Sequence, residues 1–280
     1  MRCEVIVSTY ESPRALHLCL VALYAQYRDD FNVCIADDGS SSETKELIEQ
    51  WLPRFGMSSL RHLWQPHNGF GKNKILNKAI SESKADYLIF IDGDCVPSPK
   101  FIERHISLAQ PSRFLTGGVI RLPESVSLLL QEANVASGEV FNPTWLSSVG
   151  ALRRLSDRIK LGQFPHRLTN FIEYITPVKR TWNGGNSSGW RQDLLTINGF
   201  DESLSYGAED IELGFRLNNI GVTGRHLRYS APLLHLEHSR HYIDSVQFAA
   251  NRKHVLRLRG LSLKWTNQGI LKGHPNAFKD

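Results

Sequence analysis

Short apolar segments alternate with amphipathic ones over the first hundred residues, and this alternation limits the chain to one class of fold. Four segments have the apolar character of buried strands, at residues 4–8, 31–36, 60–64 and 87–91. Between them, apolar residues recur at helical spacing over residues 14–27, 43–52 and 72–83. Strand and helix in turn predict an α/β fold, a mostly parallel, Rossmann-like sheet flanked by helices.

Polar residues collect where these predicted strands end. In a parallel α/β sheet, ligands bind beyond the carboxyl ends of the strands. Three such ends carry polar side chains: Ser8-Thr9-Tyr10, Asp37-Asp38, and Asp92-Gly93-Asp94. The sequence therefore predicts a ligand site at this edge of the sheet.

The Asp92-Gly93-Asp94 triplet follows the apolar strand 87–91 directly. Two carboxylates separated by a flexible glycine can take different tasks, one on a ribose hydroxyl and one on a divalent cation that bridges phosphates. The alternative is an ordinary polar turn, because Asp and Gly are common turn residues. The triplet alone favours the turn, and only its neighbours make a site the better interpretation.

Two neighbouring segments fit a nucleotide site. Asp37 or Asp38 could accept a hydrogen bond from a base N–H or a ribose hydroxyl, or could instead cap the helix at residues 43–52. Residues 65–74 (QPHNGFGKNK) combine a turn with two lysines, which could approach a diphosphate as point charges. The alternative for the second segment is a solvated loop that enters a helix.

The second half of the chain carries two further candidate groups. Glu209-Asp210 stands at the start of a predicted helix that ends near residue 219, where a carboxylate could deprotonate a sugar hydroxyl. Acids in a first helical turn are also common because the helix dipole favours them. His235 and His238 could hold a metal, or could be ordinary surface or core histidines.

These segments together resemble a known family. The runs VIVSTYES, CIADDGSSSET, HNGFGKNKILNKAI and YLIFIDGDCVPSP are similar to the nucleotide-binding half of family 2 glycosyltransferases with the GT-A fold. Residues 182–221, from WNGGNSSGW to the GAED segment and beyond, resemble the acceptor-side segment that these enzymes share with galactosyltransferase C-terminal modules. The resemblance implies a single GT-A domain that transfers a sugar from a nucleotide diphosphate, with inversion.

The resemblance also implies roles for individual residues. The base and ribose pocket would be lined by Ser8, Thr9, Tyr10 and Glu11, with Asp37 or Asp38 on the uracil edge, Lys72 toward the diphosphate, and Asp92 with Gly93 beside the ribose. The metal ligands would be Asp94 and His238, with Asp92 and His235 as further candidates. Asp210 would be the catalytic base, with Glu209 beside it. The sugar and acceptor pocket would be shaped by Gly184, Gly185, Asn186, Trp190 and Glu209.

Three positions depart from the family pattern. Ser8 stands where proline is usual and Glu11 where asparagine is common, so the details of the base pocket are open. Lys72 replaces the usual arginine, which exchanges a bidentate contact for a point charge.

The function that the resemblance implies is metal-dependent transfer from a UDP-sugar, of the Gal, GalNAc or GlcNAc type. The cation would be Mn²⁺ or Mg²⁺, and the acceptor a hydroxyl of a glycan, a lipid-linked sugar or a peptide. Two alternatives stay open: a nucleotide-sugar-binding module without turnover, and a nucleotidyltransferase, which would release pyrophosphate.

Composition and charge narrow the partners and the location. The net charge of +5 and pI near 9.0 would suit nucleic acid, an anionic membrane or an anionic small molecule. No nucleic-acid-binding pattern appears, so no nucleic-acid partner is expected. The four cysteines form no CxxC pair, and no signal peptide or run of about 18 apolar residues is present. We therefore expect a cytoplasmic protein, with any membrane contact peripheral, at the inner face.

The whole chain is expected to divide into three parts with different functions. Residues 1–122 would bind the nucleotide sugar, residues 123–241 would bind the acceptor and carry the catalytic base, and residues 242–280 would form a helical tail. Helices are expected at 125–138, 145–160 and 191–197, and the tail is predicted to be helical to about residue 259. The basic residues at 252–259 could touch an anionic membrane or form a solvated helix face.

Overall fold

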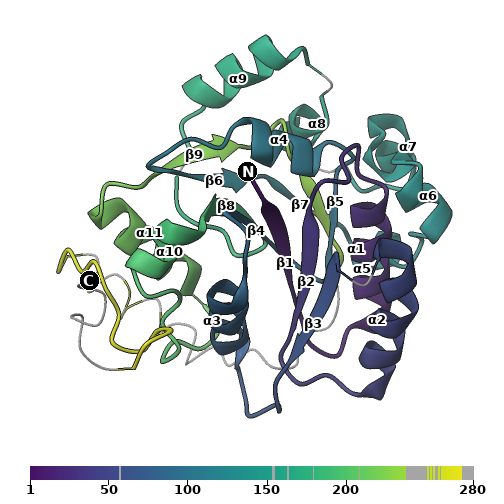
Figure 1. Ribbon diagram of the computed structural model, residues 1–280. Helices are drawn as coiled ribbons and strands as arrows, with labels where there is room; N and C mark the ends of the chain where they lie inside the picture. The colour runs from purple at the N-terminus through teal and green to yellow at the C-terminus, as the bar shows by residue number, and fades with distance from the viewer. Residues whose placement is uncertain are drawn as a thin grey trace.

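A seven-stranded sheet, in the order β3-β2-β1-β4-β8-β6-β9, forms the centre of the computed structural model (Figure 1). The structure describes residues 1–56, 58–152, 155–162, 164–178, 180–207, 209–237, 251, 253, 255, 258 and 260–272. The strands of this sheet are β1 (Cys3–Thr9), β2 (Asn32–Asp37), β3 (Leu60–Trp64), β4 (Tyr87–Asp92), β6 (Arg113–Gly117), β8 (Asn186–Trp190) and β9 (Thr223–Leu227). The neighbours β1, β2, β3 and β4 pair in parallel, and β8 runs antiparallel to β4 and β6, which confirms the mostly parallel sheet.

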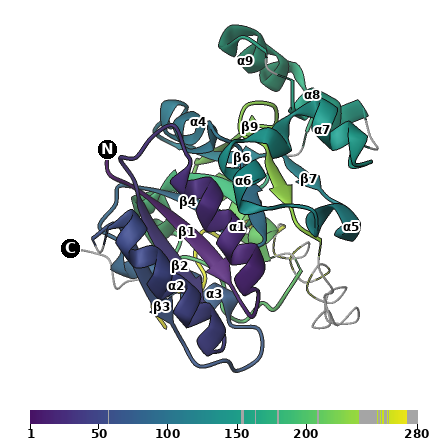
Figure 2. The ribbon, with the colours of Figure 1, turned by 90° about the vertical axis from the view of Figure 1, so that its right-hand side faces the viewer.

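Helices cover both faces of the sheet because successive strand residues point to opposite sides. Val5 and Val7 of β1 pack with α1 (Pro13–Tyr24) and α2 (Ser42–Phe55), which lie on one face. Ile6 between them packs in the other buried cluster, with the helices of the opposite face (Figures 1 and 2). Those helices are α3 (Lys72–Glu82), α10 (Arg191–Thr196) and α11 (Glu209–Asn219).

Helix α2 continues three residues beyond its predicted end and includes Pro53. Aromatic contacts hold this last turn, since the ring of Phe55 lies 5.8 Å from that of Trp51 and 5.5 Å from that of Tyr24. Gly56 then ends the helix with a φ of 85°, a conformation that glycine adopts without strain.

A second sheet of three short strands lies beside the first. Its order is β5 (Cys95–Pro97), β10 (Leu233–His235) and β7 (Val119–Arg121), with β10 antiparallel to β5 and parallel to β7. This pairing joins the chain directly after the DGD triplet to a strand more than a hundred residues later. The sheet therefore brings His235 beside the predicted metal site.

The prediction of two long helices, at residues 125–138 and 145–160, is wrong. This region instead forms short helices: α5 (Glu124–Ser127), α6 (Glu132–Ala136), the 3₁₀ turn η1 (Glu139–Phe141), α7 (Pro143–Ser148) and α8 (Leu155–Lys160). Arg14 Nη2 donates to the carbonyls of Ser127, Leu128 and Leu130, which a continuous helix would have used itself. Gly150, with a φ of 75°, follows α7.

Two more helices, α4 (Phe101–Ser107) and α9 (His166–Ile175), lie at the top of the molecule in Figure 1. Among the residues that the structure describes, no helix is long and apolar enough to span a membrane. The predicted tail helix falls mostly outside the described residues, although Asn251, Lys253, Val255 and Leu258 are helical.

Candidate active site

Three predicted site residues meet at the carboxyl ends of β1 and β4. Ser8 is the register partner of Asp92, and its Oγ donates to Asp92 Oδ1 over 2.8 Å. Lys72, the first residue of α3, donates from Nζ to the same oxygen over 2.5 Å. A hydroxyl, a carboxylate and an ammonium group therefore converge where the sequence predicted the ribose and diphosphate.

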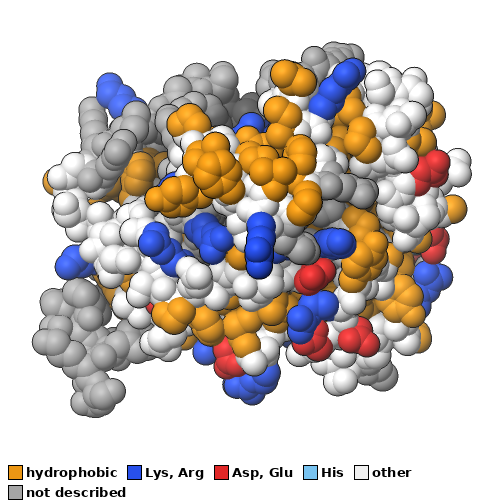
Figure 3. All heavy atoms as spheres, turned by 90° about the horizontal axis from the view of Figure 1, so that it is seen from above, with side chains coloured by type: hydrophobic (Ala, Val, Ile, Leu, Met, Phe, Trp, Pro, Cys, Tyr) orange, Lys and Arg blue, Asp and Glu red, His pale blue; other side chains and the backbone are white. Residues whose placement is uncertain are grey.

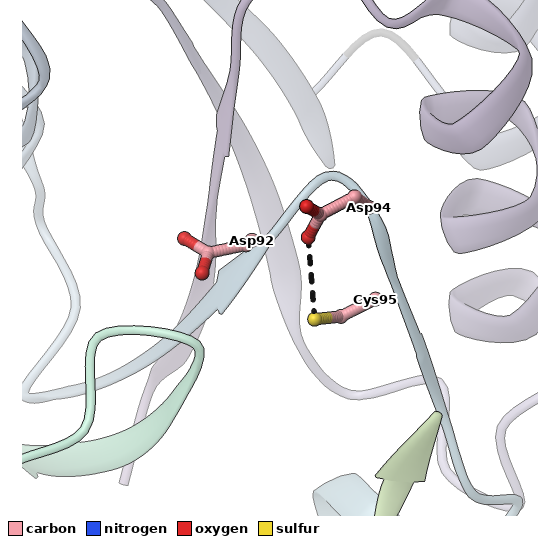
Figure 4. Close-up of side chains that lie close together, drawn as sticks. All are labelled: Asp92, Asp94 and Cys95. Carbon is pink, nitrogen blue, oxygen red and sulfur yellow. Dashed lines mark hydrogen bonds between the residues drawn. The ribbon is translucent and has the colours of Figure 1, made fainter. Parts of the chain in front are cut away.

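Asp94 lies across the turn from Asp92 and has two close neighbours. Cys95 Sγ donates to Asp94 Oδ1 over 3.4 Å, and His235 Nε2 lies 3.3 Å from Asp94 Oδ2. One ligand atom from each of Asp92, Asp94 and Cys95 lies within 4.8 Å of the others (Figure 4). The sequence interpretation missed Cys95, although its place directly after the triplet was the available signal.

The Cys95 thiol is a poor ligand for a hard cation. Burial, and then the charges of Asp94 and Asp92, raise the pKa of Cys95 well above its usual value. The thiol therefore stays protonated and acts as a hydrogen-bond donor. Carboxylate oxygens suit Mg²⁺ and Mn²⁺, and imidazole suits several transition metals, so Asp92, Asp94 and His235 fit a divalent cation. The predicted ligand His238 lies outside the described residues.

Asp210, the second residue of α11, is held by the backbone of the Gly-rich segment. Gly184 N donates to Asp210 Oδ2 over 2.8 Å. Burial, followed by the charge of Glu209, raises the pKa of Asp210 to about 7, while the charge of Lys72 and the bond from Gly184 oppose that rise. A carboxylate with a pKa near neutral can take up a proton during catalysis at physiological pH.

Glu209, the neighbouring acid, binds the backbone of its own chain. Its Oε2 accepts a hydrogen bond from Gly207 N over 2.8 Å, and the side chain is buried. This bond closes the turn that leads into α11. Of the two predicted catalytic acids, Asp210 has the surroundings of a base.

Lys72 is the cation among these acids. Burial disfavours its charge, but Asp92, Asp210 and Glu209 together outweigh burial and raise the pKa of Lys72. The lysine therefore remains charged among Asp92, Asp210 and Glu209.

Two consecutive glycines let both carboxylates approach the backbone. A Cβ at Gly184 would lie 2.6 Å from Asp210 Oδ1, and a Cβ at Gly185 would lie 2.9 Å from Asp92 Oδ2. Both distances are shorter than a real Cβ contact, so a side chain at either position would displace the carboxylate that it meets. This close approach joins the two predicted halves of the site.

Of the other two residues predicted for the sugar pocket, Asn186 lies opposite Ile91, next to Asp92, and Trp190 lies at the far end of β8. Asn186 is fully buried, and its Nδ2 donates to the carbonyls of Gly118 and Ala231, each over 3.0 Å. Trp190 pairs with Tyr87 at the start of β4, so it stands at the opposite end of that strand from Asp92. Because β8 runs antiparallel to β4, each residue after Asn186 moves farther from the site.

The acids of the predicted base pocket already have protein partners. Asp37 is fully buried and accepts from Ser40 N at 2.8 Å, Ser40 Oγ at 2.6 Å and His62 Nε2 at 3.0 Å. Asp38 accepts from Gln65 Nε2 at 2.6 Å and Gly71 N at 2.8 Å. Asp38 thus ties the strand end to the loop that leads to Lys72, the predicted phosphate-facing lysine at the start of α3.

Tyr10 and Glu11 follow β1, with different surroundings. Tyr10 is exposed and stacks on His67, with ring centroids 4.3 Å apart and an interplanar angle of 12°. Glu11 has a φ of 44°, and its carboxylate accepts from the backbone N and Oγ of Ser41, directly before α2. The aromatic stack could receive a base, whereas the Glu11 carboxylate is committed to the start of the helix. Thr9 lies next to Gly93, since a Cβ added at Gly93 would lie 3.2 Å from Thr9 Cβ.

Sequence comparisons match this chain to glycosyltransferases. Residues 4–133 match the family model described as glycosyl transferase family 2. The uncharacterized glycosyltransferase YfnE of Bacillus subtilis is 26% identical over 85% of this chain and 65% of its own length. A validoxylamine A glucosyltransferase of Streptomyces hygroscopicus subsp. jinggangensis is 25% identical over 95% of this chain and 64% of its own. The chain thus spans slightly less than two thirds of these relatives.

Solved structures share the fold. TarS of S. aureus matches with a TM-score of 0.59 and 15% identity, over 93% of this chain and 39% of that one. The mannosyltransferase PcManGT from Pyrobaculum calidifontis, solved with GDP-Man and Mn²⁺, matches with a TM-score of 0.56 and 18% identity, over 92% and 60%. TarS residues 1–349 with UDP-GlcNAc give a TM-score of 0.58 at 14% identity, over 94% and 66%. At these identities the likeness establishes the GT-A fold alone.

Proposed function

We propose, from the match of residues 4–133 to glycosyl transferase family 2, that this chain transfers a sugar from a UDP-sugar to an acceptor hydroxyl, with inversion. The observation that carries the proposal is the arrangement of Asp210 and Asp92 against consecutive glycines, with Lys72 bonded to Asp92. The arrangement supports the proposal because Asp210, an acid of near-neutral pKa, lies close to the groups that would hold the donor.

The donor would be held by groups at the ends of β1 and β4. Asp92, positioned by Ser8 and Lys72, would accept from the ribose, and the Lys72 ammonium group would face the diphosphate as a point charge. Asp94 and His235 would hold Mn²⁺ or Mg²⁺, and the bound cation would neutralise charge on the departing diphosphate. His238 stays a predicted ligand of the same site.

Asp210 would carry out the proton transfer. Its carboxylate accepts the proton of the acceptor hydroxyl while that oxygen forms a bond to the anomeric carbon of the donor sugar. The bond from the anomeric carbon to the diphosphate oxygen breaks, and the nucleoside diphosphate leaves with that electron pair. One displacement of this kind inverts the anomeric configuration.

The donor is best identified by a screen of UDP- and GDP-sugars for metal-dependent release of nucleoside diphosphate. We propose UDP with a Gal, GalNAc or GlcNAc type sugar, and an acceptor on a glycan, a lipid-linked sugar or a peptide. Supporting solved structures hold UDP-GlcNAc in one case and GDP-Man in another. A screen without an acceptor works because water can replace the hydroxyl slowly.

Asp210→Asn is the variant that tests the mechanism. It should lower turnover by roughly 10²–10⁴-fold, the usual contribution of a general base, and leave UDP binding nearly intact. The matched control is Glu202→Gln, which removes an acidic charge away from the site. Glu202 accepts hydrogen bonds from Asn77 and Lys272. Unchanged turnover in Asp210→Asn would refute the mechanism. Pyrophosphate as the product would indicate a nucleotidyltransferase, and UDP binding without turnover on any acceptor a binding module.

A further inference from the structure

Helix α9 is amphipathic in the reverse sense of an ordinary surface helix. Two of its polar residues, Thr169 and Glu173, are buried: Glu173 is 4% exposed, and its Oε1 accepts from Tyr229 N, Ser230 N and Ser230 Oγ. Its apolar residues face outward, with Phe171 59% and Tyr174 78% exposed. A surface helix normally buries its apolar stripe, so this stripe needs a partner from outside the fold.

Neighbouring residues extend this stripe into a surface. Leu155 and Ile159 of α8 and Phe164 between the two helices are also exposed, as are Leu168 and Ile175 of α9. Seen from above, hydrophobic side chains gather in one area of this face, with Lys and Arg side chains alongside (Figure 3). We call this the α8–α9 surface, and it consists of Leu155, Ile159, Phe164, Leu168, Phe171, Tyr174 and Ile175. A contiguous apolar area of this kind usually marks an interaction site.

The exposed charges that the structure describes in residues 153–180, the segment that carries the α8–α9 surface, are of one sign. Residues 153–180 include seven Lys and Arg but two acids, Asp157 and Glu173. Asp157 is bonded to Lys160 over 2.7 Å, and Glu173 is buried. The exposed charged side chains of this segment that the structure describes, Arg158, Arg167 and Arg180, are therefore all cationic.

We propose that the α8–α9 surface docks the protein onto an anionic lipid membrane. Its aromatic and aliphatic side chains would enter the boundary between headgroups and acyl chains, and the arginines would lie against lipid phosphates. A second copy of the chain fits less well, because two-fold contact would bring identical basic residues together. Anionic headgroups are complementary to these residues.

Docking in this way leaves the donor site accessible. In Figures 1 and 2, β1 begins near the end of the molecule that carries α9 and runs downward, away from that helix. The carboxyl end of β1, where the donor groups collect, therefore faces away from the membrane. The proposal concerns a surface separate from the active site and does not depend on the proposed function.

The test is co-sedimentation of the full chain with vesicles. Two compositions are compared: phosphatidylcholine alone, and phosphatidylcholine mixed with phosphatidylglycerol. Phe171→Ser combined with Tyr174→Ser removes the two most exposed aromatic side chains of α9, and their exposure means that folding should be unaffected. The matched control is Leu128→Ser with Leu129→Ser, which removes comparably exposed apolar side chains beside α5.

We expect the wild type and the control to sediment with the anionic vesicles and to be released by salt. The partition coefficient of the aromatic double variant onto the anionic vesicles should be at least roughly tenfold lower than that of the wild type. That of Arg167→Gln should be about fivefold lower. The proposal is overturned if the wild type binds neither vesicle, or if the aromatic variant binds as well as the wild type. It is also overturned if analytical ultracentrifugation shows a dimer that the aromatic variant disperses, since the occupant is then a second copy.

Discussion

Gly184 and Asp210 lie so close that the carboxylate of Asp210, the proposed base, contacts the backbone of the glycine directly. The amide of Gly184 donates to Asp210 Oδ2 over 2.8 Å, and the space for a Cβ is taken by Asp210 Oδ1, only 2.6 Å away. Residues 26 positions apart are thereby locked together. The backbone before β8 sets where the proposed base stands.

Gly184→Ala should therefore lower transfer without abolishing nucleotide binding. The added methyl group must displace the Asp210 carboxylate, and a misplacement of about 1 Å can reduce the rate by about 100-fold. Turnover and UDP affinity would be measured on the same preparation. Gly189→Ala is the control, because its Cβ would meet Trp182 at an ordinary 3.4 Å. Equal losses of turnover in the two variants would contradict the assigned role of Gly184.

The rate of transfer should depend on pH through Asp210. Burial and the charge of Glu209 raise the pKa of Asp210 to about 7, and only its deprotonated form can accept a proton. The value of kcat/KM should therefore fall about tenfold for each pH unit below neutral and level off above it. Lys72→Met removes a charge that lowers this pKa, so the inflection should move to higher pH. A profile without an inflection near neutral pH would rule out Asp210 as the base.

Removal of the metal should weaken nucleotide binding through Asp94. Asp94→Ala deletes a carboxylate that lies 3.3 Å from His235, so UDP affinity in the presence of Mn²⁺ should fall by about tenfold or more. Isothermal titration with UDP, with and without a chelator, measures this directly. The control is Asp86→Ala, an exposed acid that pairs with Arg2 before β4 begins. If Asp94→Ala retained tight metal-dependent UDP binding, the ligand would lie elsewhere.

His105 should make the fold sensitive to acid. It is buried between Ser188 Oγ, 2.7 Å from Nδ1, and Asn186 Oδ1, 3.2 Å from Nε2, and burial lowers its pKa to about 3. The unfolded chain takes up a proton at this residue below about pH 6.5, whereas the folded chain does not. Stability should thus decline by about 1.4 kcal/mol per pH unit below that value from this residue alone.

Urea unfolding of the wild type and His105→Gln across this pH range isolates the contribution of His105. The glutamine cannot titrate, so the stability advantage of the wild type should shrink as the pH falls. An advantage that stays constant with pH would show that His105 is not held neutral in the folded protein.

Much of the architecture could be predicted because it is encoded locally. The apolar segments and their helical neighbours predicted β1 to β4 and α1 to α3 within a few residues, and α11 begins and ends where expected. Helix length in the middle region was not predictable, because Arg14 stabilises the break between α5 and α6 from a distant helix. Strand β8 was also missed, since NSSGW has little apolar character and is stabilised by the strands on either side.

The sequence by itself determined the α/β sheet, the DGD triplet at the end of a strand and the acids at the start of α11, because hydrophobic periodicity and turn residues act over short stretches. Tertiary structure alone decided which polar residues meet. Lys72 at the start of α3 reaches Asp92 at the end of β4, the pairing of β10 with β5 sets His235 beside Asp94, and the antiparallel direction of β8 carries Trp190 away from the site. Such contacts join residues far apart in the chain, and the order and direction of strands that create them leave no local pattern in the sequence.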